Sequence, residues 1–290
     1  MKNGVVSFAA LWFIGLCLAF MPQCNSSHQS SGILRVRDRS EVSLPQVLKE
    51  VRHVRVLCVG ELHDEPSHHR AQLEVIRRLD DRGRKVVVGL EMFRAEEQDY
   101  LNRWVKGEVA EDDFIPVYLQ NWNFPWGLYR DIFLYCRDHG IALVGLNIPS
   151  AVTRQVGRQG FASLGEDLRQ DLPPVSCNVD LVYQDFIRRA MGVGHRHGVE
   201  FEYFCEAQLV WDTAMAWYAV KFLKENPDDT MVILAGSGHA WKRGIPEQIR
   251  RQSELPCRVI LPEMPRLDRG RVTVEDADYL WLDLPLEHAR

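Results

Sequence analysis

Short apolar runs alternate with amphipathic stretches along most of the chain. The run at 54–59 is nearly continuous, which is typical of a parallel strand with both faces covered. Asp64 can cap a helix over 66–81, since proline suits a first helical turn and Gly83 ends it. The same pattern predicts strands over 85–90, 141–146, 231–235, 258–261 and 279–282, and helices over 95–105, 128–137 and 246–252.

This alternation predicts an α/β fold with a mostly parallel sheet flanked by helices. A helical stretch over 181–223 predicts a helical insert between the third and fourth strands. Right-handed crossovers place the carboxyl ends of parallel strands along one edge, where ligands bind in open sheets. We therefore expect a single domain over 43–290 with its site at that edge.

Polar residues follow the ends of four predicted strands. Glu61 and His63 follow the first, Glu91 the second, Asn147 the third and His239 the fourth. The two carboxylates and two imidazoles are suited to a divalent Mn, Fe, Co or Zn ion, and equally to general acid and base catalysis. One such residue is more often a helix cap, but the four positions together indicate a site.

Two helices carry further candidates. Gln208, Asp212 and Met215 share one face of the predicted insert, where buried polar groups need partners. His69 shares a face with Ile76 in the helix over 66–81. Either set is compatible with structural hydrogen bonding or with ligand contact.

An aromatic segment at 114–129 shows no clear helical period and is predicted to be irregular. Core packing is the usual fate of such residues. Alternatively the segment walls a pocket for a flat ligand such as haem, with a tyrosine on the iron. A Cys-x-x-Cys-His sequence is absent, so haem would be held non-covalently. The aromatic residues are Phe114, Tyr118, Trp122, Phe124, Trp126 and Tyr129.

The amino-terminal segment resembles a secretory leader: Lys2, an apolar run at 5–21, and a polar stretch at 25–32. Cys24 stands where a bacterial lipoprotein carries its acylated cysteine, although Gln23 replaces the small residue expected before it. We expect a leader at 1–24, a polar tether at 25–42, and an exported protein held at a membrane of the cell envelope by a lipid on Cys24. Soluble export and an uncleaved anchor are the alternatives.

Composition narrows the function classes. The formal net charge of -5, with no long run of Lys or Arg, disfavours nucleic-acid binding. The cysteines beyond the leader show no C-x-x-C spacing, which argues against a zinc-thiolate site and favours buried free thiols.

Over about 54–261 the chain resembles the ChaN-like haem-binding lipoproteins of the Tiki superfamily, whose wider relatives include TraB-type proteins, Tiki metalloproteases and erythromycin esterases. The order and spacing of several motifs carry the resemblance. They are Gly60-Glu61-Leu62-His63-Asp64, Gly89-Leu90-Glu91-Met92-Phe93 with Gln98, Asn147-Ile148-Pro149, the stretch 207–216 and Gly236-Ser237-Gly238-His239.

The resemblance implies haem binding linked to iron uptake, with tyrosine and a nearby histidine at a homodimer interface. Our first hypothesis is therefore an exported, non-enzymatic haem-binding protein. Its candidate haem contacts are Tyr129, Tyr118, His69, Gln208 and Asp212.

The second hypothesis is a metal-dependent hydrolase, in which Glu61, His63, Glu91 and His239 hold one divalent ion that activates water. Glu61 and His63 would be its catalytic residues. A metal-free esterase with His63 or Glu61 as base is a third.

Overall fold

The structure of the chain is a computed structural model that describes residue 1 and residues 32–170, 172–175, 177–192 and 198–285. Cys24 and the rest of the expected leader beyond Met1 lie outside the described residues. In the part of the chain that the structure describes, no helix combines the length and the apolar character needed to cross a bilayer.

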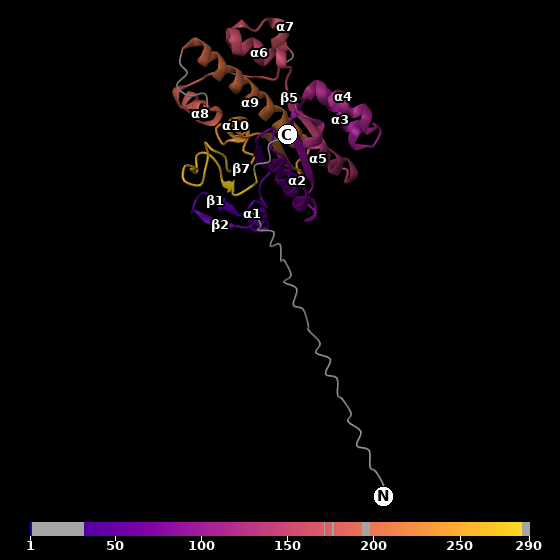
Figure 1. Cartoon of the computed structure of the whole chain (residues 1–290). Coiled ribbons are helices and arrows are strands. Elements are labelled where there is room, and N and C mark those ends of the chain that lie inside the picture. Colours follow the sequence, from indigo (N-terminus) through magenta and orange to yellow (C-terminus); the bar gives the residue numbers. More distant parts are fainter. Residues whose placement is uncertain (2–31, 171, 176, 193–197, 286–290) are drawn as a thin grey trace. The chain divides into compact units, whose positions relative to one another are not determined.

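Among the described residues, eight strands form one mostly parallel sheet in the order β2-β1-β8-β7-β3-β6-β4-β5. Figure 1 shows the chain coloured along its sequence, with several of the helices and strands labelled. The strands from β8 to β5 run parallel, whereas β1 pairs antiparallel with β8 and β2. The α/β class is therefore confirmed. The bounds are β1 (Ile33–Arg35), β2 (Ser40–Val42), β3 (Val56–Glu61), β4 (Val86–Arg94), β5 (Ala142–Asn147), β6 (Thr230–Gly236), β7 (Cys257–Pro262) and β8 (Tyr279–Trp281).

Helices cover both faces of the sheet. In β3, Leu57 and Val59 pack into a core shared with α1 to α5, whereas Val56 and Cys58 pack into a second core shared with α8 to α11. Two covered faces explain why the strand is apolar at successive positions. The helices are α1 (Leu44–Glu50), α2 (Pro66–Asp80), α3 (Gln98–Val105), α4 (Glu111–Asn121), α5 (Trp126–Asp138), α6 (Ser150–Gln159), α7 (Glu166–Gln170), α8 (Leu181–Met191), α9 (Val199–Glu225), α10 (Ser237–Ala240) and α11 (Ile245–Gln252).

The aromatic segment is helical, so the prediction of an irregular segment is wrong. Most of it forms α4 and the first turn of α5, with Pro116 inside α4. Phe114 and Tyr118 are fully buried and pack against Trp126. Core packing is therefore confirmed for the inner part of this segment.

The insert between β5 and β6 is longer than predicted. It begins at Ser150 with α6 and α7, and continues through α8 and α9. Val152 and Val156 of α6 pack on Val210 of α9 in a third apolar cluster, which gives the insert a small core of its own.

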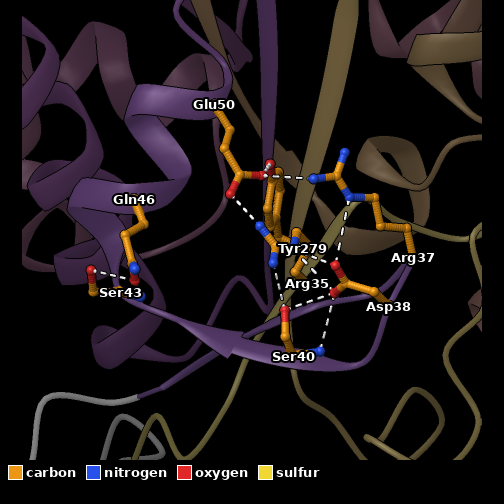
Figure 2. Close-up of polar contacts among 8 residues, drawn as sticks. All are labelled: Arg35, Arg37, Asp38, Ser40, Ser43, Gln46, Glu50 and Tyr279. Carbon is orange, nitrogen blue, oxygen red and sulfur yellow. Dashed lines mark hydrogen bonds and ion pairs between the residues drawn. The ribbon is translucent and has the colours of Figure 1, made fainter.

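Residues 33–42, assigned to the tether by sequence, form the β1–β2 hairpin of the sheet. Arg35 of β1 bonds to Glu50 of α1 and to Ser40 of β2, the latter at 2.8 Å, and Tyr279 of β8 donates to Glu50 at 2.9 Å (Figure 2). The folded unit therefore extends upstream of residue 43, and the hairpin shortens the expected tether. The strands are only three residues long and follow a polar tract, which hid them from the sequence analysis.

Candidate functional site

The carboxyl end of β3 supplies Glu61, a buried carboxylate surrounded by three polar rings. Its Oε1 lies 2.9 Å from Nδ1 of His63 and accepts a hydrogen bond from Tyr129, and its Oε2 lies 3.3 Å from Nε2 of His69. The tight turn after the strand is held by His68, whose Nδ1 accepts the Leu62 amide at 2.9 Å. The turn thereby brings His63 back over the strand end.

These contacts shift the pKa values of the cluster. Burial alone would raise the pKa of Glu61, but hydrogen bonds from His63 and His69 lower it well below its ordinary value. Burial acts to lower the pKa of His63, but the bond to Glu61 and the charge of Glu91 raise it above 6.5. Burial raises the pKa of Tyr129 and Tyr118, and the Glu61 charge adds to it, so both phenols are protonated at neutral pH.

His63 is the part of this cluster that reaches the surface. Its side chain is 29% exposed, and its ring lies 4.9 Å from the ring of Trp122 and 5.0 Å from that of Phe124. On its other side, a Cβ on Gly236 would lie 2.6 Å from Cε1 and 2.8 Å from Nε2 of His63. Glycine at the end of β6 is therefore needed for the imidazole to occupy this place.

Glu91 of β4 connects this cluster to a second one. Its Oε2 accepts the Gly236 amide at 2.6 Å, and its Oε1 lies 3.7 Å from Nε2 of His239. Nδ1 of His239 lies 2.6 Å from Oδ1 of Asp212 on α9, and Tyr183 of α8 donates to Oδ2 of Asp212 at 3.1 Å. A chain of buried polar contacts thus runs across the edge of the sheet.

His239 is held as a cation by two carboxylates. Burial acts to lower its pKa, but the charges of Glu91 and Asp212 and the hydrogen bond to Asp212 raise it to about 9. Burial raises the pKa of Asp212, and His239 opposes that rise. Because two carboxylates face one imidazole, the protonated form of His239 is favoured.

Asn147 fixes the backbone beside Glu91. Its Nδ2 donates to the Glu91 carbonyl at 2.5 Å, and its Oδ1 accepts from the indole of Trp211 at 2.6 Å. The structure thus brings together all the predicted strand-end residues: Glu61, His63, Glu91, Asn147 and His239.

The predicted haem contacts all lie inside the protein. Tyr118 and Tyr129 are fully buried, and His69, Gln208 and Asp212 are 3%, 7% and 1% exposed. A haem would reach them only after the surrounding packing opened, so direct haem contact stays a prediction for these five. Asp212 bonds to His239, whereas Oε1 of Gln208 has no hydrogen-bond partner among the described residues.

The predicted metal set is not arranged to hold an ion. Across residues 32–170, 172–175, 177–192 and 198–285, no group of three or more His, Cys, Asp or Glu side chains has suitable geometry. The contacts supply a reason, because these groups already have protein partners. Glu61 contacts the His63 imidazole, Oε2 of Glu91 accepts the Gly236 amide, and His239 contacts Asp212.

Three contributors were missed as site residues. Tyr183 follows the helix cap Asp180, and its contact with Asp212 depends on how α8 packs on α9, which no local pattern encodes. Trp211 looked like part of an apolar helix. His68 falls in the first turn of the predicted helix over 66–81, and this position after a strand-end glycine was the available signal for its structural role.

A model of the family described as "Haem-binding uptake, Tiki superfamily, ChaN" matches residues 47–249. The chain is 23% identical over 257 residues to "Protein RETICULATA-RELATED 5, chloroplastic" of Arabidopsis thaliana, covering 81% of this chain and 35% of that protein. The chain therefore spans about a third of the length of that curated relative.

Solved structures with a similar fold include "Cofacial heme binding to ChaN of Campylobacter jejuni", with a TM-score of 0.69 and 19% identity over 88% of this chain and 97% of that one. An erythromycin esterase, EreC, in its open conformation has a TM-score of 0.49 and 14% identity, over 80% and 76% of the two chains.

Proposed function

Because the chain belongs to the family of haem-binding uptake proteins of the Tiki superfamily that includes ChaN, we propose that it binds haem at the edge where His63 reaches the surface. The main support for this proposal is the exposure of the His63 imidazole. His63 is 29% exposed, whereas the side chains of His69 and His239 are 3% and 7% exposed. His63 is thus the imidazole of the site that a bulky planar ligand meets first.

The surroundings of His63 fit such a ligand. Imidazoles that bind metals usually carry a carboxylate partner on the other ring nitrogen, as Glu61 does here on Nδ1. This leaves Nε2 as the iron ligand. The half-buried Phe124 offers ring surface for the apolar body of a porphyrin, and the buried Trp122 packs against it.

A hemin titration of the purified protein tests this proposal. We expect a saturable shift of the Soret band that His63→Gln removes or weakens at least about tenfold, and that His53→Gln, on an exposed histidine, leaves unchanged. If Tyr129→Phe or Tyr118→Phe loses the Soret shift and His63→Gln keeps it, the iron ligand is a tyrosine and not His63. No shift in the wild type would refute haem binding.

A role in uptake requires export, which we propose from the leader-like residues 1–24. Cys24 would then carry the lipid that holds the protein at a membrane of the cell envelope. Expression in a bacterium with labelled palmitate tests this: label should enter the wild type and not Cys24→Ala. A labelled Cys24→Ala variant, or an unlabelled wild type, would contradict lipidation of Cys24.

We further propose that haem joins two copies of the chain. The similar structure of ChaN from Campylobacter jejuni is described as cofacial haem binding, and a haem bound to a partly exposed imidazole leaves one of its own faces uncovered. Sedimentation with and without hemin should show a haem-dependent dimer in the wild type and a monomer in His63→Gln. A monomer at saturating hemin would refute haem-linked pairing.

A second candidate function is hydrolysis without a metal, favoured by the pairing of His63 with Glu61. The carboxylate orients the ring, and the bond to Glu61 and the charge of Glu91 raise the pKa of His63, which makes the ring a stronger base. Turnover of 4-nitrophenyl acetate by the haem-free protein that is lost in His63→Gln would support it. Equal rates in the two proteins would refute it.

A further inference from the structure

A cavity of about 550 Å³ lies between α9 and α11, apart from the edge that carries His63. Trp217 and Val220 of α9 and Pro174 supply its apolar wall, and Lys221, Lys224 and Arg251 supply positive charge. Ligand pockets in proteins commonly span roughly 300–1,000 Å³ and combine an apolar lining with a few polar groups. The size and lining of this cavity match that description.

The charges around the cavity are not balanced. Arg251 pairs with Glu247 at 3.1 Å, and the ammonium of Lys221 lies 5.3 Å from the centre of the Trp217 ring. Within the described part of the chain, no carboxylate is within ion-pair distance of Lys221 or Lys224. Glu225 is the one carboxylate of the lining and forms no ion pair with either lysine within the described residues, so the cavity keeps an excess of positive charge on a protein whose formal net charge is -5.

A buried amide at the cavity lacks a partner. Gln248 of α11 is 4% exposed, and its Nε2 has no hydrogen bond among the described residues. Its Oε1 lies 3.5 Å from the hydroxyl of Thr213, which donates at 2.6 Å to the Leu209 carbonyl. Rotating the amide by half a turn would let Nε2 donate to the Thr213 hydroxyl and would leave Oε1 as the unpaired atom. In either orientation one buried polar atom is left unsatisfied, at a cost of about 1–3 kcal/mol, which a polar group of a bound ligand would offset.

We propose that this cavity binds a small organic anion with a flat apolar body. The body packs against Trp217, the acidic group pairs with Lys221 and Lys224, and a polar group of the ligand forms a hydrogen bond with the Gln248 amide. None of these residues takes part in the proposed haem site, so the two proposals can be tested independently.

The fluorescent aromatic sulfonate 8-anilinonaphthalene-1-sulfonate is a suitable probe, titrated into the full-length, haem-free protein. We expect saturable binding that Lys221→Gln with Lys224→Gln weakens about tenfold, or 1.4 kcal/mol. Trp217→Leu and Gln248→Leu should weaken it too, and salt should weaken binding to the wild type more than binding to the double lysine variant. The matched control is Lys49→Gln with Lys106→Gln, which removes the same charge from exposed positions elsewhere.

The uncharged probe N-phenyl-1-naphthylamine tests whether the cavity selects an anion. It should bind the wild type more weakly and be insensitive to the lysine changes. The proposal is overturned if the lysine double variant binds the sulfonate within about twofold of wild type, if the control double variant loses as much, or if the neutral probe binds equally well. Both lysines are exposed, so their variants remain informative even where Trp217→Leu does not fold.

Discussion

At the scale of single residues, His239 makes stability depend on pH. Its pKa of about 9 in the folded protein exceeds the ordinary 6.5, because the charges of Glu91 and Asp212 outweigh its burial. Between these two values the folded protein holds a proton that the unfolded chain has lost, so stability must fall as pH rises. We expect the free energy of unfolding to decrease by about 3 kcal/mol from pH 6.5 to pH 9.

The variant Asp212→Asn isolates this contribution in denaturant titrations at several pH values. It removes one of the two negative charges while retaining an acceptor for Nδ1, so the pH-dependent decrease should become smaller. Asp131→Asn, at a side chain that is 77% exposed, should behave as wild type. Equal pH profiles for wild type and Asp212→Asn would show that His239 is not the group responsible.

Gly236 provides a second prediction at this scale. The Cβ of Gly236→Ala would meet the His63 ring at 2.6 Å, and Glu61 holds that ring by its Nδ1, so the ring must turn away. We expect hemin affinity to fall about tenfold while the melting temperature changes by only a few degrees. Gly165→Ala is the control, since its Cβ would meet nothing within 4 Å. Wild-type hemin affinity in Gly236→Ala would contradict a role for the position of His63.

At the scale of elements, sequence alone located the central strands because each is buried on two faces. The runs that became β3 and β6 were identified to within two residues at each end. The β4 strand was cut short at residue 90, because its last residues combine a carboxylate with aromatic and basic side chains. Helix α4 was missed because Pro116 and the dense aromatics obscure its period, whereas tertiary packing around Phe114 helps to stabilise it.

The edge strand β5 leads to a prediction about Gln98. Its amide donates to the Leu143 carbonyl at 2.8 Å and accepts from the Gly145 amide at 3.0 Å, so one side chain pairs with the open side of the strand. We expect Gln98→Leu to lower the free energy of unfolding by about 1–3 kcal/mol in urea titrations. Asn102→Ala removes only the other contact of Gln98 and should cost less. A larger loss in Asn102→Ala than in Gln98→Leu would contradict this role.

At the scale of the whole molecule, topology explains why the site was partly predictable. Parallel strands with right-handed crossovers bring their carboxyl ends to one edge, so Glu61, Glu91, Asn147 and His239 were expected to meet, and they do. The sequence did not show which of these side chains would be buried. The way α4 and α5 pack over the edge decides whether His63 reaches solvent and whether Tyr129 is buried.

The same whole-molecule view predicts where the folded unit must begin. Ile33, Leu34 and Val36 are 0%, 2% and 4% exposed, and burying one such side chain fully contributes about 1.5–3 kcal/mol. Deleting residues 1–42 removes all three and leaves β8 with an unpaired edge. That loss is comparable with the whole stability of a typical domain, about 5–15 kcal/mol.

We therefore expect a chain starting at residue 43 to unfold or aggregate at room temperature, whereas a chain starting at Gly32 melts cooperatively. Thermal melting and soluble yield measure the difference. A variant that starts at Gly32 and carries Arg35→Gln separates packing from polar contact, because it loses the bonds to Glu50 and Ser40 but keeps the apolar strand (Figure 2). It should melt between the other two. If the chain from residue 43 melts within a few degrees of the longer one, the hairpin is an appendage of the sheet and the domain begins at α1, as the sequence pattern indicates.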